Sequence, residues 1–164
     1  MKQMNIGITV EVYESMEELR EDDRKLLELA ENSTLSAYAP YSHFKVGAAL
    51  RLKNGRVITG NNQENVAYPS GMCAERVAMY YAGSQYPGEA IETIAVAAYS
   101  DDFTVNEVSP CGACRQAMAE YQLQQQNPIR VIMKGKKGNI HIVNSVEALL
   151  PLMFHAEELK KKDI

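Results

Sequence analysis

The sequence predicts a three-layer α/β/α sandwich built on a mixed β-sheet of about five strands, a fold of the α/β class. Two β-rich runs flank Asn54-Gly55, and Asn-Gly between such runs is the strongest short-range hairpin signal. Residues 91–99 have the length and apolar composition of a buried strand. Strands then alternate with helical patterns towards the C-terminus, which is typical of α/β proteins.

The 164 residues are enough for one domain with a substantial core. We expect residues 1–20 to form an N-terminal extension and residues 21–164 to form a single catalytic domain. The extension contains a short alternating stretch, residues 5–14, that is compatible with a strand. Acidic residues follow it and stand in the first turn of the next predicted helix, where the helix dipole stabilises them.

A helix is expected from Glu21 to about Ala37, broken by Pro40. Its apolar stripe comprises Leu26, Leu27, Ala30 and Leu35. Further along the chain we expect a hairpin over residues 44–62, helices over 73–82 and after Pro110, strands over 129–133 and 140–143, and a short helix ending at Pro151.

Charge and hydropathy exclude some classes of partner. The net charge is −4, whereas a protein that binds nucleic acid usually shows a basic face. The basic clusters 134–137 and 160–162 resemble a turn and a tail. No apolar run approaches the roughly 20 residues of a membrane span, and the first residues lack the apolar centre of a signal peptide. We therefore expect a cytoplasmic protein with no nucleic-acid or membrane partner.

The chain has three cysteines, an odd number that does not suit a disulfide framework. Cys111 and Cys114 form a C-x-x-C motif, which on its own is compatible with a redox dithiol, half of a metal site or coincidence. The position of the motif in the chain does not favour a thioredoxin-like site. The three histidines, His43, His141 and His155, lie outside both cysteine motifs.

A single cysteine in a helical pattern is usually a small buried hydrophobe. Together with the C-x-x-C motif, however, Cys73 favours a metal site. Cys73 and Cys111 both stand at predicted helix N-termini, where the partial positive charge favours thiolate. Three thiolates could bind one Zn²⁺ and leave its fourth position open, which is the arrangement of a catalytic site. Water in that position would be acidic enough to supply hydroxide near neutral pH.

Glu75 and Arg76 follow Cys73 directly in the sequence. A carboxylate two residues after a ligand could take a proton from water and pass it to a substrate. Arg76 could donate a hydrogen bond to a thiolate and withdraw some of its charge. The simpler alternatives are a solvated glutamate in the first helical turn and a surface arginine.

These motifs identify a resemblance. "CAE" (73–75) and "PCGACRQ" (110–116) resemble the zinc-dependent cytidine deaminase superfamily. Residues 37–50, 59–76, 109–116 and 149–154 also resemble, in the same order, the small homotetrameric cytidine deaminases that act on free nucleosides.

The resemblance implies a role for each matched residue. Cys73, Cys111 and Cys114 would bind one zinc ion per chain, and Glu75 would be the proton shuttle. Asn62 and Glu64 would hydrogen-bond the ribose hydroxyl. The other residues expected near the nucleoside are Phe44, Ala74 and Phe154, the last of which would reach the site of a neighbouring subunit. "HAEEL" after Phe154 departs from the Gly-Pro of many relatives, and the extension is longer than compact members need.

The predicted function is hydrolytic deamination of cytidine and deoxycytidine to uridine and deoxyuridine, with release of ammonia, in pyrimidine salvage. One alternative is a deaminase of a modified cytosine nucleoside resembling blasticidin S deaminase, a group that lacks the "NxEN" ribose signature. Another is a zinc protein that binds nucleosides without catalysis, against which the intact Glu75 argues. Nucleic-acid editing is disfavoured by the charge, and a redox C-x-x-C protein is the weakest candidate.

Overall fold

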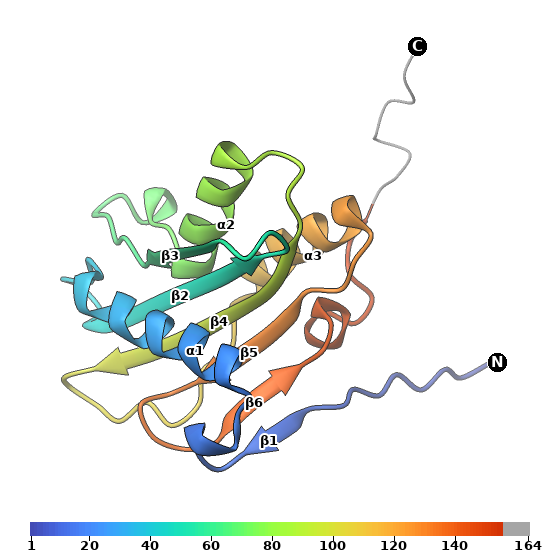
Figure 1. Ribbon diagram of the computed structural model, residues 1–164, viewed down its shortest axis with the longest axis horizontal. Coiled ribbons are helices and arrows are strands. Elements are labelled where there is room, and N and C mark those ends of the chain that lie inside the picture. Colours follow the sequence, from blue (N-terminus) through green and yellow to red (C-terminus); the bar gives the residue numbers. More distant parts are fainter. Residues whose placement is uncertain (156–164) are drawn as a thin grey trace.

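A mixed sheet forms the middle layer of the protein (Figure 1), in a computed structural model that describes residues 1–155. The sheet has 6 strands in the order β1-β6-β5-β4-β2-β3. Only β4 and β5 pair in parallel, and the other neighbours are antiparallel. The strands are β1 (Glu11–Tyr13), β2 (Phe44–Leu52), β3 (Val57–Asn61), β4 (Ile91–Ser100), β5 (Arg130–Lys134) and β6 (Ile140–Val143).

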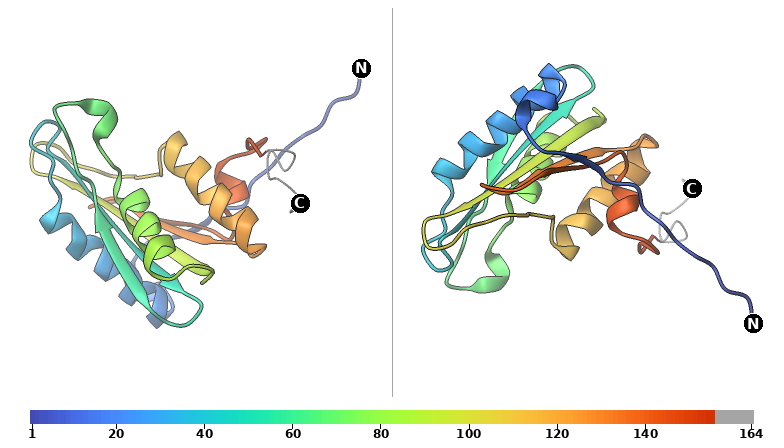
Figure 2. Two further views of the ribbon diagram at one scale, coloured as in Figure 1. Left: turned by 90° about the horizontal axis from the view of Figure 1, so that it is seen from above. Right: turned by 90° about the horizontal axis from the view of Figure 1, so that it is seen from below.

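Helices cover both faces of the sheet, which confirms the predicted three layers (Figure 2). Helix α1 (Glu21–Ser33) lies on one face, and α2 (Ala74–Gln85) and α3 (Gly112–Gln125) lie on the other. The core is accordingly divided in two. Ala49 of β2 packs with Leu26 and Leu27 of α1, whereas Ala48 and Leu50 pack with Met79 and Met118 of α2 and α3.

The alternation of side chains along β2 sorts its residues between the two cores. Successive residues of a strand point to opposite faces. Even-numbered positions such as Ala48 and Leu50 face α2 and α3, so Phe44 at the start of the strand belongs to that same face. The face that carries α2 and α3 is also the one on which both cysteine motifs lie.

Two glycines allow the helices to approach the sheet closely. A Cβ at Gly60 of β3 would lie 2.7 Å from the Ala74 carbonyl oxygen and 2.7 Å from the Ala78 nitrogen of α2. On the opposite face, a Cβ at Gly47 of β2 would overlap the Ala30 carbonyl oxygen of α1. Such distances leave no room for a side chain, so glycine at Gly60 sets the position of α2 on the sheet.

The structure differs from the sequence-based expectation at three places. The sixth strand is β1, which the extension adds to the edge of β6. Helix α1 ends at Ser33 and continues as a 3₁₀ helix, η2 (Thr34–Ser36). The tighter 3₁₀ winding rotates Leu35 off the apolar stripe, and its side chain is 78% exposed. The short C-terminal helix, η4 (Val146–Leu149), is 3₁₀ rather than α-helical.

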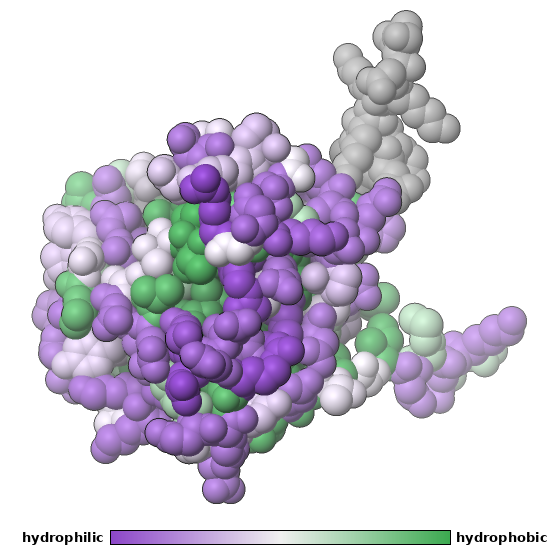
Figure 3. Space-filling model, in the orientation of Figure 1, coloured by the Kyte–Doolittle hydropathy of each residue, from purple (hydrophilic) through white to green (hydrophobic). Residues whose placement is uncertain are grey.

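The remaining 3₁₀ turns are η1 (Met16–Glu18) and η3 (Tyr68–Ser70). The N-terminal end of the chain projects from the body of the protein, and Figure 3 shows hydrophobic residues at the surface of the segment that precedes β1. They include Ile6 and Ile8, both half exposed. None of the helices within residues 1–155 is long and apolar enough to cross a membrane.

Candidate active site

The three cysteines converge at the N-termini of α2 and α3. Cys73 is the N-cap residue of α2 and Cys111 the N-cap residue of α3, which confirms the predicted helix starts. The Sγ atoms of Cys73 and Cys111 are 3.9 Å apart, and those of Cys111 and Cys114 are 3.6 Å apart. All three Sγ atoms lie within 4.8 Å of one another.

This spacing fits a tetrahedral zinc site. A zinc–sulfur bond of about 2.3 Å places neighbouring tetrahedral sulfurs about 3.8 Å apart, close to the two measured distances. Within residues 1–155, the cluster capable of holding a metal contains no histidine or carboxylate ligand. Three thiolates and a zinc ion therefore match the donor set, with one coordination position left for a small ligand.

The charges around the cluster favour thiolate at Cys73. A hydrogen bond from the Cys114 thiol, together with Arg76 and Cys111, lowers the pKa of Cys73 to about 5. The same hydrogen bond raises the pKa of Cys114, since Cys114 retains the shared proton. Arg76 Nη2 donates to Cys73 Sγ over 3.8 Å, as its position in the sequence suggested. Its Nε is buried and has no hydrogen-bond partner in the described part of the chain.

Glu75 lies in the first turn of α2, next to the thiols. Its side chain is only 4% exposed, so it is not a solvated surface glutamate. Burial raises the pKa of the Glu75 carboxyl, because the charged form is poorly solvated there. The carboxylate also interacts with the Cys114 thiol. Ala74, between Cys73 and Glu75, is fully buried.

A cavity of about 510 Å³ opens beside Cys73. Asn62 and Glu64 both line it, so the structure brings these two predicted residues to the cluster. Glu64 Oε2 accepts from the backbone nitrogens of Tyr41 (2.9 Å) and Ser42 (3.3 Å), and Glu64 Oε1 accepts from the Ser42 hydroxyl. A carboxylate has about four acceptor sites, so Glu64 keeps capacity for a further donor.

The amide of Asn62 joins the wall of this cavity to the start of β2. Asn62 Oδ1 accepts from the Val46 nitrogen at 2.8 Å, and Asn62 Nδ2 donates to the Phe44 carbonyl oxygen at 2.9 Å. The second hydrogen on Nδ2 remains available for a ligand.

The two predicted aromatic residues are placed differently. Phe44 is half-buried and lies on the sheet face that carries the cysteines. Phe154 is 70% exposed, and its carbonyl oxygen accepts from Gln116 Nε2 at 2.9 Å. Neither Phe44 nor Phe154 lines the 510 Å³ cavity. His155 is the last described residue, so the rest of the "HAEEL" departure lies outside the described part of the chain.

Two residues of this region were missed by sequence reasoning. Ser42 connects Glu64 to the Phe44 nitrogen, from which its hydroxyl accepts at 3.0 Å. Arg115 donates to the carbonyl oxygens of Pro110 (2.7 Å) and Leu149 (2.8 Å), and so holds the residue before Cys111 against η4. The only signal for Arg115 was its place in "CGACRQ", directly after the second cysteine.

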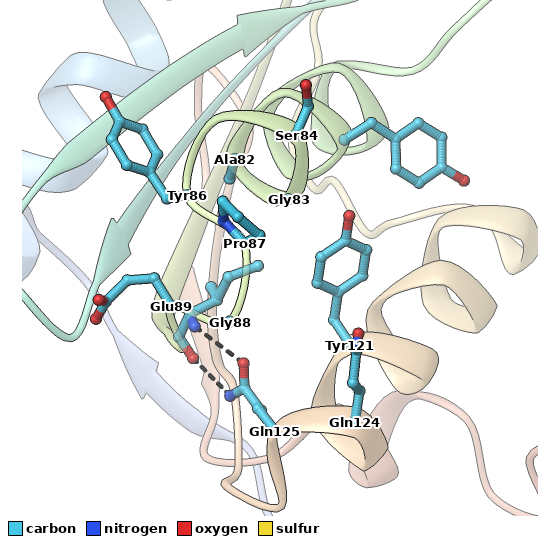
Figure 4. A pocket seen from close by; sticks show the side chains of 12 residues that line it. Ala82, Gly83, Ser84, Tyr86, Pro87, Gly88, Glu89, Tyr121, Gln124 and Gln125 are labelled. Atoms are coloured by element: carbon cyan, nitrogen blue, oxygen red, sulfur yellow. Dashed lines mark hydrogen bonds between the residues drawn. The ribbon is translucent and has the colours of Figure 1, made fainter. Parts of the chain in front are cut away.

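A second cavity, of about 550 Å³, lies at the C-terminal ends of α2 and α3 (Figure 4). Tyr80, Tyr121 and Pro87 line it, and the cysteines and Glu75 do not. Gln125 spans its floor and bonds both the nitrogen (2.9 Å) and the oxygen (2.8 Å) of Ile91. This cavity is therefore separate from the candidate active site.

Comparison with known proteins agrees with the geometry of the cluster. Residues 20–127 match the family model for the cytidine and deoxycytidylate deaminase zinc-binding region. A cytidine deaminase of Halalkalibacterium halodurans is 40% identical over 138 residues, which cover 84% of this chain and 98% of that protein. A blasticidin-S deaminase of Bacillus cereus is 30% identical over 139 residues, 83% of this chain and 94% of that protein.

Solved structures give the same assignment. The crystal structure of a cytidine deaminase from Burkholderia pseudomallei aligns with a TM-score of 0.69 and 38% identity. The alignment covers 83% of this chain and 100% of that one. With a matching family model, matching relatives and a cluster of three cysteines beside a buried glutamate, the chain belongs to the zinc-dependent cytidine deaminase family.

Proposed function

We propose that this enzyme hydrolyses cytidine and deoxycytidine to uridine and deoxyuridine, with release of ammonia, in pyrimidine salvage. The observation that carries the proposal is the buried Glu75 carboxyl beside the three thiols of Cys73, Cys111 and Cys114. The catalytic domain comprises residues 21–164, and residues 1–20 are an extension that precedes it.

Zinc held by the three thiolates would supply the Lewis acidity that makes water nucleophilic near neutral pH. Glu75 then handles the protons of the reaction. Its carboxylate accepts a proton from the attacking water and delivers it to the ring nitrogen next to the amine-bearing carbon. In a second transfer it takes the remaining proton from the hydroxyl group added to the ring carbon and gives it to the amine, which leaves as ammonia while the ring carbonyl forms. A raised pKa suits this role, because the carboxyl must be able to hold the proton between transfers.

The wall of the 510 Å³ cavity supports a nucleoside as the substrate class. Glu64 keeps an acceptor site and Asn62 a donor, which together suit a sugar hydroxyl. A carboxylate accepts strongly from a hydroxyl and repels a nearby phosphate, so a nucleotide is a poor substrate. Glu64 and Asn62 also argue against the blasticidin-type alternative, because that group of deaminases does not need a carboxylate that binds ribose.

Exposed apolar side chains support a homotetramer with shared sites. Phe154 is 70% exposed and Leu152 83% exposed, and both belong to the segment expected to reach a neighbouring subunit. Tyr68 lines the cavity yet is 77% exposed, and Val66 is 79% exposed. Surface of this kind around an open cavity is suited to a second copy of the chain. The free cysteines suit a reducing compartment, and we place the enzyme in the cytoplasm.

Ammonia release measured side by side on cytidine, deoxycytidine, CMP and blasticidin S tests the proposal. Both nucleosides should be turned over, and CMP should be much poorer. Preference for blasticidin S over cytidine would favour the alternative deaminase. Binding of cytidine without release of ammonia from a zinc-loaded protein would show that it only binds nucleosides.

A further inference from the structure

Two loops at one end of the sheet contact each other through successive side chains. The rings of Phe103 and Phe44 are stacked, with centroids 6.1 Å apart and planes inclined by 4°. Next to them, Asp102 Oδ2 lies 2.6 Å from His43 Nδ1. The loop that follows β4 and the segment that precedes β2 meet here (Figure 1) because Phe44 pairs with Ser100 in antiparallel register.

The stacked pair lies on the side of the sheet that carries the thiol cluster. Phe44 shares its face of β2 with Ala48, which packs with Ala74 and Ala78 of α2. The carbonyl oxygen of Phe44 accepts from Asn62, a residue of the cavity wall beside Cys73. Phe44 is therefore held by the cavity wall through its backbone and by Phe103 through its ring.

The loop that carries Phe103 is anchored without it. Val105 is 5% exposed, and its carbonyl oxygen accepts from the Lys137 nitrogen at 3.1 Å. At the end of the loop, Arg115 Nε donates to the Pro110 carbonyl oxygen at 2.7 Å. Phe103 itself stays 51% exposed, so about half of this large side chain remains in contact with solvent. A large exposed ring in this polar segment is explained by its contact with Phe44.

We infer that Phe103 is a positioning residue for the nucleoside site: it fixes the ring of Phe44 in the orientation that the nucleoside meets. The His43–Asp102 pair holds the two loops at the separation that the stack requires. This inference rests on the proposed nucleoside substrate and on the position near it that the family resemblance implies for Phe44. An aromatic side chain fixed before the ligand arrives lowers the ordering cost of binding, so substrate affinity should respond more than the chemical step.

A double-mutant cycle between Phe103 and Phe44 tests this inference. Phe103→Ala should raise KM for cytidine about twofold to tenfold, with kcat nearly unchanged. This fold-change corresponds to the interaction free energy of a stacked aromatic pair. Phe103→Tyr keeps the ring and should restore wild-type KM. In a Phe44→Ala background, Phe103→Ala should have no further effect, because the partner ring is gone. Thr104→Ala, in the same loop, is the matched control and should leave KM unchanged.

Calorimetric binding of cytidine to the same variants in a Glu75→Gln background gives a readout that does not depend on turnover. The dissociation constant should follow the pattern of KM. Additive effects of Phe103→Ala and Phe44→Ala, or a lower melting temperature without a change in KM, would show that Phe103 is a structural anchor only. If wild type binds cytidine but releases no ammonia, the proposed function fails while the coupling can still be measured.

Discussion

Gly60 of β3 lies against Ala74, the first residue of α2, so closely that a Cβ at Gly60 would be 2.7 Å from the Ala74 carbonyl oxygen. Ala74 stands between Cys73 and Glu75 in the sequence. The distance between the sheet and the metal-binding helix therefore depends on the absence of a side chain at Gly60.

Gly60→Ala should lower kcat/KM for cytidine by about tenfold to a hundredfold, because displacement of a catalytic group by about 1 Å can cost that much. The matched control is Gly47→Ala, which crowds α1 on the opposite face of the sheet. It should lower the melting temperature but leave the turnover of the folded enzyme intact. Equal loss of turnover in the two variants would contradict a specific role for Gly60.

Each chain should bind about one zinc ion through thiolates alone, since the Sγ atoms of Cys73, Cys111 and Cys114 match a tetrahedral set. Elemental analysis gives the stoichiometry, and cobalt substitution should produce intense thiolate charge-transfer bands. Removal of the metal by a chelator should abolish ammonia release, and added zinc should restore it. An active metal-free enzyme would disprove the assignment.

Glu75→Gln should keep the zinc and the fold but lower kcat by at least a factor of about 10²–10⁴, the range for loss of one general acid–base group. The amide has nearly the same size in this buried position and cannot transfer a proton. Zinc content and the melting temperature serve as controls. A variant within tenfold of wild type would mean that another group shuttles the proton.

Glu64→Ala should lower kcat/KM for cytidine. The loss should correspond to about 1–3 kcal/mol of transition-state stabilisation, the range for losing a hydrogen bond to a charged group. Because Glu64 also accepts from Ser42 and from the Tyr41 nitrogen, Ser42→Ala is the control for loosening of the loop. Turnover of free cytosine, which has no ribose, separates the two effects. A loss by Glu64→Ala that is equal for cytidine and cytosine would indicate a purely structural carboxylate.

Phe154→Ala should weaken cytidine binding without changing zinc content, if the exposed Phe154 closes the site of a neighbouring subunit. Mixing this variant with Glu75→Gln under subunit exchange should create sites with an intact Glu75 from one chain and an intact Phe154 from another. Activity should then exceed the sum of the two parents. Verified exchange without recovery, or a monomer by light scattering, would exclude shared sites.

The thiol cluster was predictable because its signals are local. Cys73 and Cys111 each stand at a helix start that the neighbouring residues in the sequence indicate. The motifs that contain them also match a known family. The predicted sheet, hairpin and helices followed from periodicity and from Asn54-Gly55. These patterns need no knowledge of distant parts of the chain.

What could not be predicted depends on partners far away in the sequence. Asp23 resembles an ordinary acidic residue of a first helical turn, yet its side chain is only 1% exposed. Its Oδ2 atom lies 2.7 Å from Nη1 of Arg130 in β5. The stacking of Phe103 on Phe44 depends equally on two loops that meet only in the folded protein. Leu35 was assigned to the core because a continuous helix was assumed, and the 3₁₀ turn after Ser33 moved it outside.

The pairing of β1 with β6 has a consequence for biosynthesis. Glu11 of β1 pairs with Ile142 of β6, so β1 leaves the ribosome long before the strand with which it pairs. Until β6 has been made, residues Glu11–Tyr13 stay without their sheet partner, and apolar residues such as Ile6 and Ile8 lie just before them in the sequence. Unpaired strands of this kind are prone to associate with other nascent chains. Slow translation should therefore expose the enzyme to aggregation through its N-terminal segment.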